Sequence, residues 1–298
     1  MPEYPDITVY IERLEALLKD EILEKARIVS PFFLRSVEPQ ISAIEGRSVL
    51  GFRRMGKRIV FAFTDDHYLV IHLMVAGRLY WKTKGAPVPR KGGLAAFDFS
   101  NGSLLVMEHG TKKRASLHLV HGEARLEDFD PGGLEILEAS REEFSERLMS
   151  ENHTLKRALT DPRLFSGVGN AYSDEILHAA RLSPLKLTHK MDDDEITRLF
   201  TVAKHVLEEW TERLRREAAG GFPGKVTAFH TEMAVHGRYG KPCPVCATAI
   251  QRIQYAENET NYCPRCQTGG ALLADRVLSQ LLKKDWPRTI EELEEKRK

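Results

Sequence analysis

The chain has 298 residues, of which 42% are hydrophobic and 29% charged, a composition typical of a water-soluble protein of about two domains. Its 44 Lys and Arg residues balance 43 Asp and Glu residues, so the net charge neither favours nor excludes a nucleic-acid partner. No apolar run has the length of a membrane span, and the N-terminus lacks an apolar signal segment. We therefore expect a cytoplasmic protein without a membrane segment.

The chain begins MPEYPD, with a proline directly after the initiator methionine and then a carboxylate. The simpler interpretation is that Pro2 and Glu3 precede a helix, because proline suits a helix entrance. A second interpretation is that removal of the methionine exposes Pro2 as a secondary amine. Such an amine titrates near neutrality and can attack a carbonyl-like carbon. These six residues alone favour the simpler interpretation.

The first half of the chain predicts one helix followed by short strands. Apolar residues recur at helical spacing over 6–20, with Asp6 at the position of an N-cap. From about residue 47 to 120 the segments IVFAF, YLVIHL, RLYW, AAFDF, LLVM and SLHLV are separated by turn signals. This spacing predicts an antiparallel sandwich or barrel. EDFDPGG at 127–133 is typical of a linker.

The second half of the chain predicts helices. Ser140 and Glu143 form a capping box, and helical patterns follow over about 154–165, 173–180 and 193–217. GGFPGK at 220–225 lacks the glycine spacing of a phosphate-binding loop, so we interpret it as a flexible loop. The last thirty or so residues predict an amphipathic helix.

All four cysteines lie in two C-x-x-C pairs separated by sixteen residues: Cys243, Cys246, Cys263 and Cys266. Two such pairs supply the four thiolates of a tetrahedral zinc site, and the alternating residues between them are typical of a hairpin. The alternative is two disulfides or free buried thiols, which a cytosolic chain disfavours. Four protein ligands leave no position open for water, so we expect one structural Zn²⁺ per chain.

The segment LFSGVGNAYSDEIL at 164–177 predicts a tight turn between two helices, because Gly167, Gly169 and Asn170 tolerate positive φ. Backbone N–H groups at the start of the second helix form a natural anion site, to which Lys156 could add a cation. A DNA phosphate is the natural ligand of such a group. The alternative is a plain helix connection.

Four motifs now occur in one order: the N-terminal Pro-Glu, RRMGK, a lysine followed by GVGNAYSDEIL, and VHGRYGKPCPVC…YCPRCQ. Together they resemble the formamidopyrimidine-DNA glycosylase and endonuclease VIII family over about residues 2–267. The resemblance implies an α+β multidomain fold with DNA in the cleft between domains. We expect a catalytic antiparallel β-sandwich with a helix over 1–130, a helix-two-turn-helix domain over 131–235, a zinc-finger hairpin over 236–267 and a helical extension over 268–298.

The resemblance also implies catalytic roles. Pro2 matches the nucleophile that attacks the sugar C1′ and forms a Schiff base, and Glu3 matches the acid that protonates the sugar. Asp6 stands where the family usually has Glu, so it is either catalytic or only a cap. Lys57 matches the lysine that contacts DNA near the lesion.

Further positions match DNA-contacting residues of the family. Lys156 and Asn170, with Gly169 beside it, match the residues that grip phosphate. At the position of the gap-filling methionine the chain has Val75, preceded by Met74.

Two other family features differ in this chain. The Arg-Arg-Phe-Gly wedge loop is replaced by MEHGTKKRASL. In this loop either Arg114 or the neighbouring Lys112 and Lys113 act as the wedge, or the basic residues form only a solvated turn. The hairpin arginine five residues before the third cysteine is replaced by Asn258.

The sequence thus predicts a bifunctional DNA glycosylase and abasic-site lyase of base-excision repair that acts on oxidised bases. Its partner is double-stranded DNA with damaged bases or abasic sites, and we expect a monomer in a bacterial-type cytoplasm, associated with the nucleoid. The alternative is a weakly active or inactive protein of the same fold that binds damaged or abasic DNA. A more distant alternative is a zinc-ribbon module for RNA or protein.

Overall fold

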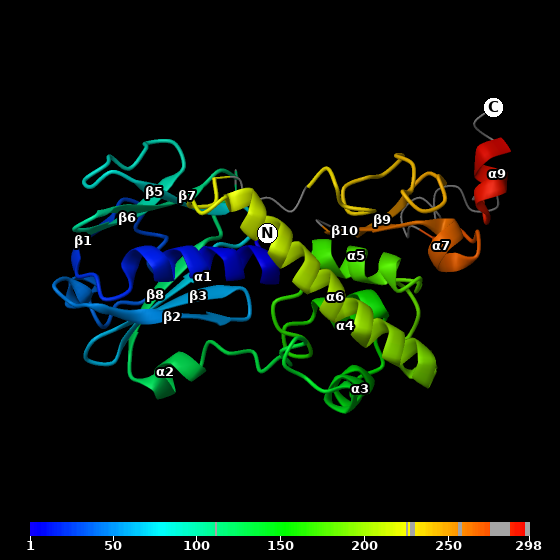
Figure 1. Ribbon diagram of the computed structural model, residues 1–298, viewed down its shortest axis with the longest axis horizontal. Coiled ribbons are helices and arrows are strands. Elements are labelled where there is room, and N and C mark those ends of the chain that lie inside the picture. Colours follow the sequence, from blue (N-terminus) through cyan, green and yellow to red (C-terminus); the bar gives the residue numbers. More distant parts are fainter. Residues whose placement is uncertain (111, 225, 227–229, 256–257, 275–286, 296–298) are drawn as a thin grey trace. The chain divides into compact units, whose positions relative to one another are not determined.

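A computed structural model (Figure 1) describes residues 1–110, 112–224, 226, 230–255, 258–274 and 287–295. The chain forms two compact units. The first comprises Met1–Pro131 and Glu209–Ala228, and the second Gly132–Glu208 and Phe229–Lys298.

The first unit is an antiparallel β-sandwich with one long helix, α1 (Tyr4–Leu18). One four-stranded sheet has the order β2-β3-β4-β8 and the other β1-β6-β7-β5. The strands of the first sheet are β2 (Val49–Met55), β3 (Arg58–Phe63), β4 (His67–His72) and β8 (Ser116–His121). Those of the second are β1 (Leu23–Ile28), β5 (Gly77–Lys82), β6 (Gly93–Phe99) and β7 (Gly102–Glu108).

A single hydrophobic core joins both sheets to the helix. It contains Ile7, Tyr10 and Leu14 of α1 together with aromatic and aliphatic residues of both sheets, such as Phe61 and Phe97. Alternation along the strands directs one face of each sheet into this core. Two short elements complete the first unit: η1 (Ile41–Ile44) and α2 (Glu123–Glu127).

The second unit is helical and ends in a small hairpin. Its helices are α3 (Arg141–Met149), α4 (Leu155–Thr160), α5 (Asn170–Ala179), η2 (Thr188–Lys190) and the first part of α6 (Asp193–Ala218). The antiparallel hairpin of β9 (Gln251–Tyr255) and β10 (Asn258–Tyr262) is followed by α7 (Pro264–Thr268) and α9 (Ile290–Glu295).

The structure confirms the sandwich, the helices near the N-terminus and over 193–217, the capping box of Ser140 and Glu143, and the hairpin between the cysteine pairs. β1, β2 and α2 were not predicted from the sequence. The helix expected over 154–165 is only Leu155–Thr160, and α5 begins at Asn170 rather than at residue 173. Part of the expected C-terminal helix lies outside the described residues.

Two local predictions are wrong. The N-cap of α1 is Glu3 and not Asp6, because Pro5 occupies the first turn and Asp6 stands at the third helical position. In the turn before α5, Gly167 has a positive φ of 77°, but Gly169 is extended and caps the helix. Among the described helices, none has the length and hydropathy needed to cross a membrane.

Candidate active site and nucleic-acid interface

Glu3 and Asp6 hold the start of α1 through a reciprocal capping box. The Glu3 side chain accepts from the Asp6 backbone N–H, and Asp6 Oδ2 accepts from the Glu3 backbone N–H at 2.8 Å. Both residues are buried, at 1% and 2% exposure. This arrangement fixes the backbone of the first residues of the chain, which would otherwise fray.

The amine of Met1 lies near charged groups from three separate segments of the first unit. Burial lowers the pKa of the Met1 amine; Glu3 and Asp6 oppose this shift, whereas Arg78 and Lys57 add to it. The charges of Glu3, Asp6 and Lys57 therefore all act on the Met1 amine. Arg78 is an addition that the sequence did not indicate.

Asp6 is a carboxyl that titrates near neutrality. Burial raises its pKa to about 7, although the backbone bond to Glu3 lowers it. Its Oδ1 is buried and has no hydrogen-bond partner in the described part of the chain. A buried oxygen without a partner is costly as an anion, which is why the neutral acid is favoured.

A cavity of about 130 Å³ opens beside Asp6. Its other lining residues come from α1, the end of α6 and the loop after it: Val9, Leu214, Glu217, Ala218, Pro223, Gly224 and Val226. The wall is mainly apolar, and Asp6 is a polar group within it. Sequence analysis interpreted 220–225 only as a flexible loop.

Lys57 lies in the tight turn between β2 and β3, where Gly56 has a positive φ of 61°. Arg54 supports this turn from two sides. Its Nη1 donates to the Gly56 carbonyl oxygen at 2.7 Å, and its guanidinium stacks over the Tyr4 ring at 4.4 Å. Arg54 thus connects the lysine turn to the first turn of α1.

The turn between β4 and β5 presents Val75 rather than Met74 to solvent. Val75 is 59% exposed, whereas Met74 is half-buried with a positive φ of 52°. The turn closes tightly because Gly77 donates to the Leu73 carbonyl, and a Cβ on Gly77 would lie 2.2 Å from that oxygen. Arg78, whose charge is near the amine, donates to the Val75 carbonyl at 3.2 Å.

The loop that replaces the wedge is organised by Glu108. Its buried Oε1 accepts from the backbone N–H groups of Arg114 at 2.9 Å and Ala115 at 3.2 Å. The Lys113 ammonium donates to the Glu108 carbonyl. The side chain of Arg114 is exposed, as is that of Lys112.

This loop also contacts the turn that carries Val75. The His109 backbone N–H donates to the Ala76 carbonyl at 3.1 Å, and the His109 ring is 2.9 Å from the Tyr80 hydroxyl. The exposed valine and the basic loop therefore lie on neighbouring segments of one unit.

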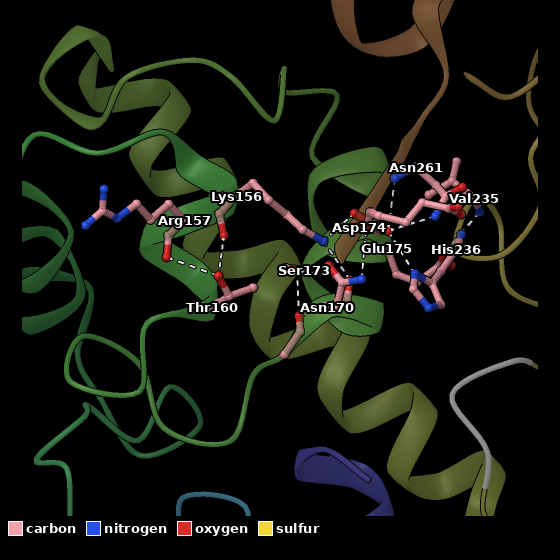
Figure 2. A network of polar contacts seen from close by, with 12 residues as sticks. Lys156, Arg157, Thr160, Asn170, Ser173, Asp174, Glu175, Val235, His236 and Asn261 are labelled. Atoms are coloured by element: carbon pink, nitrogen blue, oxygen red, sulfur yellow. Dashed lines mark hydrogen bonds and ion pairs between the residues drawn. The ribbon is translucent and has the colours of Figure 1, made fainter. Parts of the chain in front are cut away.

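In the second unit, Lys156 and Asn170 belong to one buried polar network (Figure 2). The Lys156 ammonium donates to Asp174 Oδ1 at 2.5 Å and to the Asn170 carbonyl at 2.7 Å. Its side chain is only 11% exposed, and that of Asp174 is fully buried. Lys156 is thus an internally paired cation at the start of α5.

The same helix connects to the segment before the zinc finger and to strand β10 inside the finger. The other Asp174 oxygen accepts from His236 Nδ1 at 2.8 Å and from the Asn261 backbone N–H at 3.1 Å. Glu175 accepts from three successive backbone N–H groups, those of Ala234, Val235 and His236. Burial raises the pKa of Glu175, and these bonds oppose the shift.

The four cysteines form one cluster whose sulfur atoms all lie within 4.8 Å of one another. The Cys246 sulfur is 3.4 Å from that of Cys263 and 3.5 Å from that of Cys266, and Cys243 is 3.9 Å from Cys266. Thiolates around a tetrahedral zinc at ~2.3 Å lie about 3.8 Å apart. The residues therefore fit one Zn²⁺, and no disulfide joins them.

Asn258 begins β10 opposite Tyr255, and its side chain lies outside what the structure describes. Arg252, on the neighbouring strand β9, donates to Glu259 at 3.1 Å and stacks over Tyr239 at 4.3 Å. Asn170 also reaches this hairpin, because its Nδ2 donates to the Glu259 carbonyl at 2.7 Å.

Sequence analysis missed several residues that organise the site: Arg54, Arg78, Glu108, Asp174, Glu175 and His236. The sequence contains a signal for Asp174 and Glu175, because these adjacent acids in SDEIL follow a glycine turn and precede apolar positions. Acids at the start of a helix are common, however. The pattern alone does not show whether they are buried and accept backbone N–H groups or are exposed to solvent in the first turn.

Three family models match the chain in series. The formamidopyrimidine-DNA glycosylase N-terminal domain matches residues 1–113, the H2TH domain of the same enzyme matches 135–217, and a zinc finger found in FPG and IleRS matches 240–269. Sandwich, helical turn and cysteine cluster thus occur in the order of these domains.

Individual relatives agree with this order. A formamidopyrimidine-DNA glycosylase of Exiguobacterium sibiricum is 30% identical over 283 residues, covering 90% of this chain and 99% of the relative. A Mycobacterium tuberculosis relative, described as an uncharacterized formamidopyrimidine-DNA glycosylase-like protein, is 36% identical over 151 residues, which cover 51% of this chain and 94% of the relative. The chain belongs to the formamidopyrimidine-DNA glycosylase family.

Solved structures with this fold contain DNA. Lactococcus lactis Fpg bound to DNA with an abasic site has a TM-score of 0.79 and 26% identity, with 89% of this chain and 99% of that chain covered. The complex of the same protein with DNA containing Fapy-dG has a TM-score of 0.79 and 25% identity, with 89% and 100% covered.

Proposed function

We propose that the protein is a DNA glycosylase and abasic-site lyase that removes oxidised bases from double-stranded DNA, working as a monomer. The observation that carries the proposal is that the terminal amine, here that of Met1, lies near the charges of Glu3 and Asp6 at the start of α1 and of Lys57 in the turn between β2 and β3. A secondary amine at the chain terminus titrates near neutrality and is nucleophilic in its neutral form.

The reagent is the secondary amine of Pro2 after methionine removal. The Pro2 nitrogen bonds to C1′, and the base leaves with the bonding electrons of its C1′–N bond and takes up the proton that the Pro2 nitrogen loses. Glu3 protonates the ring oxygen O4′, the C1′–O4′ bond breaks, and the opened sugar is held as an iminium on Pro2. The resulting iminium acidifies the C2′–H bond. Loss of that proton and of the 3′ phosphate then breaks the strand, and water releases the enzyme.

The flipped nucleotide needs a place beside the amine. We assign the flipped base to the cavity next to Asp6, whose apolar wall suits the face of a base and whose acid adds a polar contact. Lys57 meets the DNA near the lesion, and Val75 fills the gap that the nucleotide leaves. The exposure of Val75 supports this role.

Phosphate contacts come from the second unit. The N-terminus of α5, with Gly169 and Asn170, offers backbone N–H groups to a phosphate, and Lys156, whose charge is paired with Asp174, holds the Asn170 carbonyl beneath them. The zinc holds the finger together and does no chemistry, because its four protein ligands leave no open position.

The decisive test is borohydride trapping on abasic-site DNA. The untagged protein should form a covalent complex through Pro2, whereas a protein with a retained N-terminal tag should not, because an amide nitrogen is not nucleophilic. Equal trapping of both proteins would move the nucleophile to a lysine. Tight binding of damaged duplex without trapping or excision would instead indicate a DNA-binding protein of the same fold.

A further inference from the structure

One face of α5 carries polar side chains that all contact the zinc-finger segment. Asn170, Asp174 and His178 are spaced by four residues, so they lie in a row on the helix. Asn170 bonds Glu259 and Asp174 bonds Asn261, as described above. The third member, His178, contacts the cysteine cluster itself.

His178 is 5% exposed, and its Nε2 lies 3.3 Å from the sulfur of Cys243. Cys243 is also buried, at 3% exposure, and accepts the Val245 backbone N–H at 3.4 Å. A sulfur bound to zinc is a thiolate without a proton, so it can only accept a hydrogen bond. The geometry therefore requires the tautomer of His178 that carries its proton on Nε2.

We propose that His178 is a positioning residue of the zinc site, donating its Nε2–H to the metal-bound thiolate of Cys243. The bond offsets negative charge on a sulfur that is otherwise buried, and it attaches the metal site to the helix whose first residue is Asn170. Outer partners of metal ligands typically contribute about 10–100-fold in metal affinity. His178 is not itself a ligand, because the four sulfurs complete the tetrahedron.

The first test uses unsubstituted protein in which an NMR-active cadmium isotope replaces zinc. Imidazole nitrogen labelling should show a proton on Nε2 of His178 that exchanges slowly with water and shares a scalar coupling with the metal. An Nε2 without a proton in the metal-loaded protein would overturn the proposal. This measurement does not depend on whether a variant folds.

The second test compares zinc affinities of the full chain by competition with a chelator at fixed pH. His178→Phe keeps an aromatic ring without a donor and should bind zinc about 10–100-fold more weakly. His178→Gln, whose amide nitrogen can reach the place of Nε2, should recover most of the affinity. His205→Phe on the exposed side of α6 is the matched control and should bind as the wild type does.

Wild-type affinity in His178→Phe would refute the proposal. So would equal losses in the Phe and Gln variants, because a packing defect does not distinguish a donor from a ring. Neither experiment contains DNA, so the result stands apart from the proposed glycosylase activity.

Discussion

The raised pKa of Asp6 predicts that its amide variant, Asp6→Asn, changes how stability depends on pH. The amide keeps the shape of the side chain, and its carbonyl oxygen can accept the Glu3 N–H that Asp6 Oδ2 now accepts at 2.8 Å. It cannot ionise. The variant therefore resembles the protonated acid at every pH.

The size of the effect follows from linkage. Folding raises the pKa of Asp6 from 3.8 to about 7, so the folded state binds more protons between these values. Wild-type stability then falls as pH rises, by about 1.4 kcal/mol per pH unit, and levels off above the folded pKa. The whole interval corresponds to about 4 kcal/mol, of which about 3 kcal/mol falls between pH 5 and pH 8. Relative to the wild type, the free energy of unfolding of Asp6→Asn should therefore rise by about 3 kcal/mol between pH 5 and pH 8.

The assay is urea unfolding at a series of pH values, followed by tryptophan fluorescence. Trp81 and Trp210 lie in the same compact unit as Asp6. Asp98→Asn is the control: burial would raise the pKa of Asp98, but bonds from Arg27 and Ser103 lower it. The stability that the ionised Asp98 contributes is lost only at acidic pH. The difference in the free energy of unfolding between Asp98→Asn and the wild type should therefore be flat between pH 5 and pH 8. A flat difference for Asp6→Asn would show that Asp6 titrates at its ordinary value.

Four further substitutions test other parts of the site. Asp174→Ala leaves the buried Lys156 ammonium unpaired and should lower the free energy of unfolding by about 3–5 kcal/mol in urea titrations; a loss below ~1 kcal/mol would contradict the buried pair. Val75→Ala should leave stability unchanged, since the side chain is exposed, yet slow base excision more than cleavage of preformed abasic sites in single-turnover assays. Arg114→Ala should likewise slow base excision more than cleavage of preformed abasic sites, because a guanidinium can stack on an orphaned base. Normal excision by Arg114→Ala and by the alanine variants of Lys112 and Lys113 would place the wedge elsewhere. Asn258→Arg should tighten binding to abasic-site duplex and steepen the log–log salt dependence by up to about one unit, and an unchanged slope would place this residue away from DNA.

The parts of the fold that the sequence could predict are those set by local periodicity or by ligand chemistry. The row of apolar residues along α1, the alternating strands and the cysteine pairs each depend on spacing within a short segment. β1 was missed because LEKARI alternates poorly, with adjacent exposed residues at Glu24 and Lys25. Its place is fixed by pairing with β6, which lies far along the chain.

The residues of the candidate site also divide into those that local sequence predicts and those that contacts between distant segments determine. Motif spacing indicated Glu3, Lys57 and Asn170, but it could not show which charges share a site. The pairing of Lys156 with Asp174 joins residues 18 positions apart. The N-cap was assigned to Asp6 because Asp is a preferred capping residue, whereas Pro5 requires the helix to begin earlier. Tertiary contacts and proline geometry thus decided what local preference did not.

In both units, buried carboxyl groups accept hydrogen bonds from irregular backbone and so fix its conformation. Loops cannot satisfy their N–H groups through a regular ladder, so a buried acceptor must do so. Glu108 accepts two N–H groups of the basic loop, and Glu175 accepts three in the segment before the zinc finger. Asp6 accepts the backbone N–H of Glu3, and among the described residues one oxygen of Asp6 and one of Glu108 are buried without a hydrogen-bond partner. Asp6 also lines the cavity of about 130 Å³, and burial raises its pKa to about 7, so its carboxyl is a hydrogen-bonding group at the wall of that cavity.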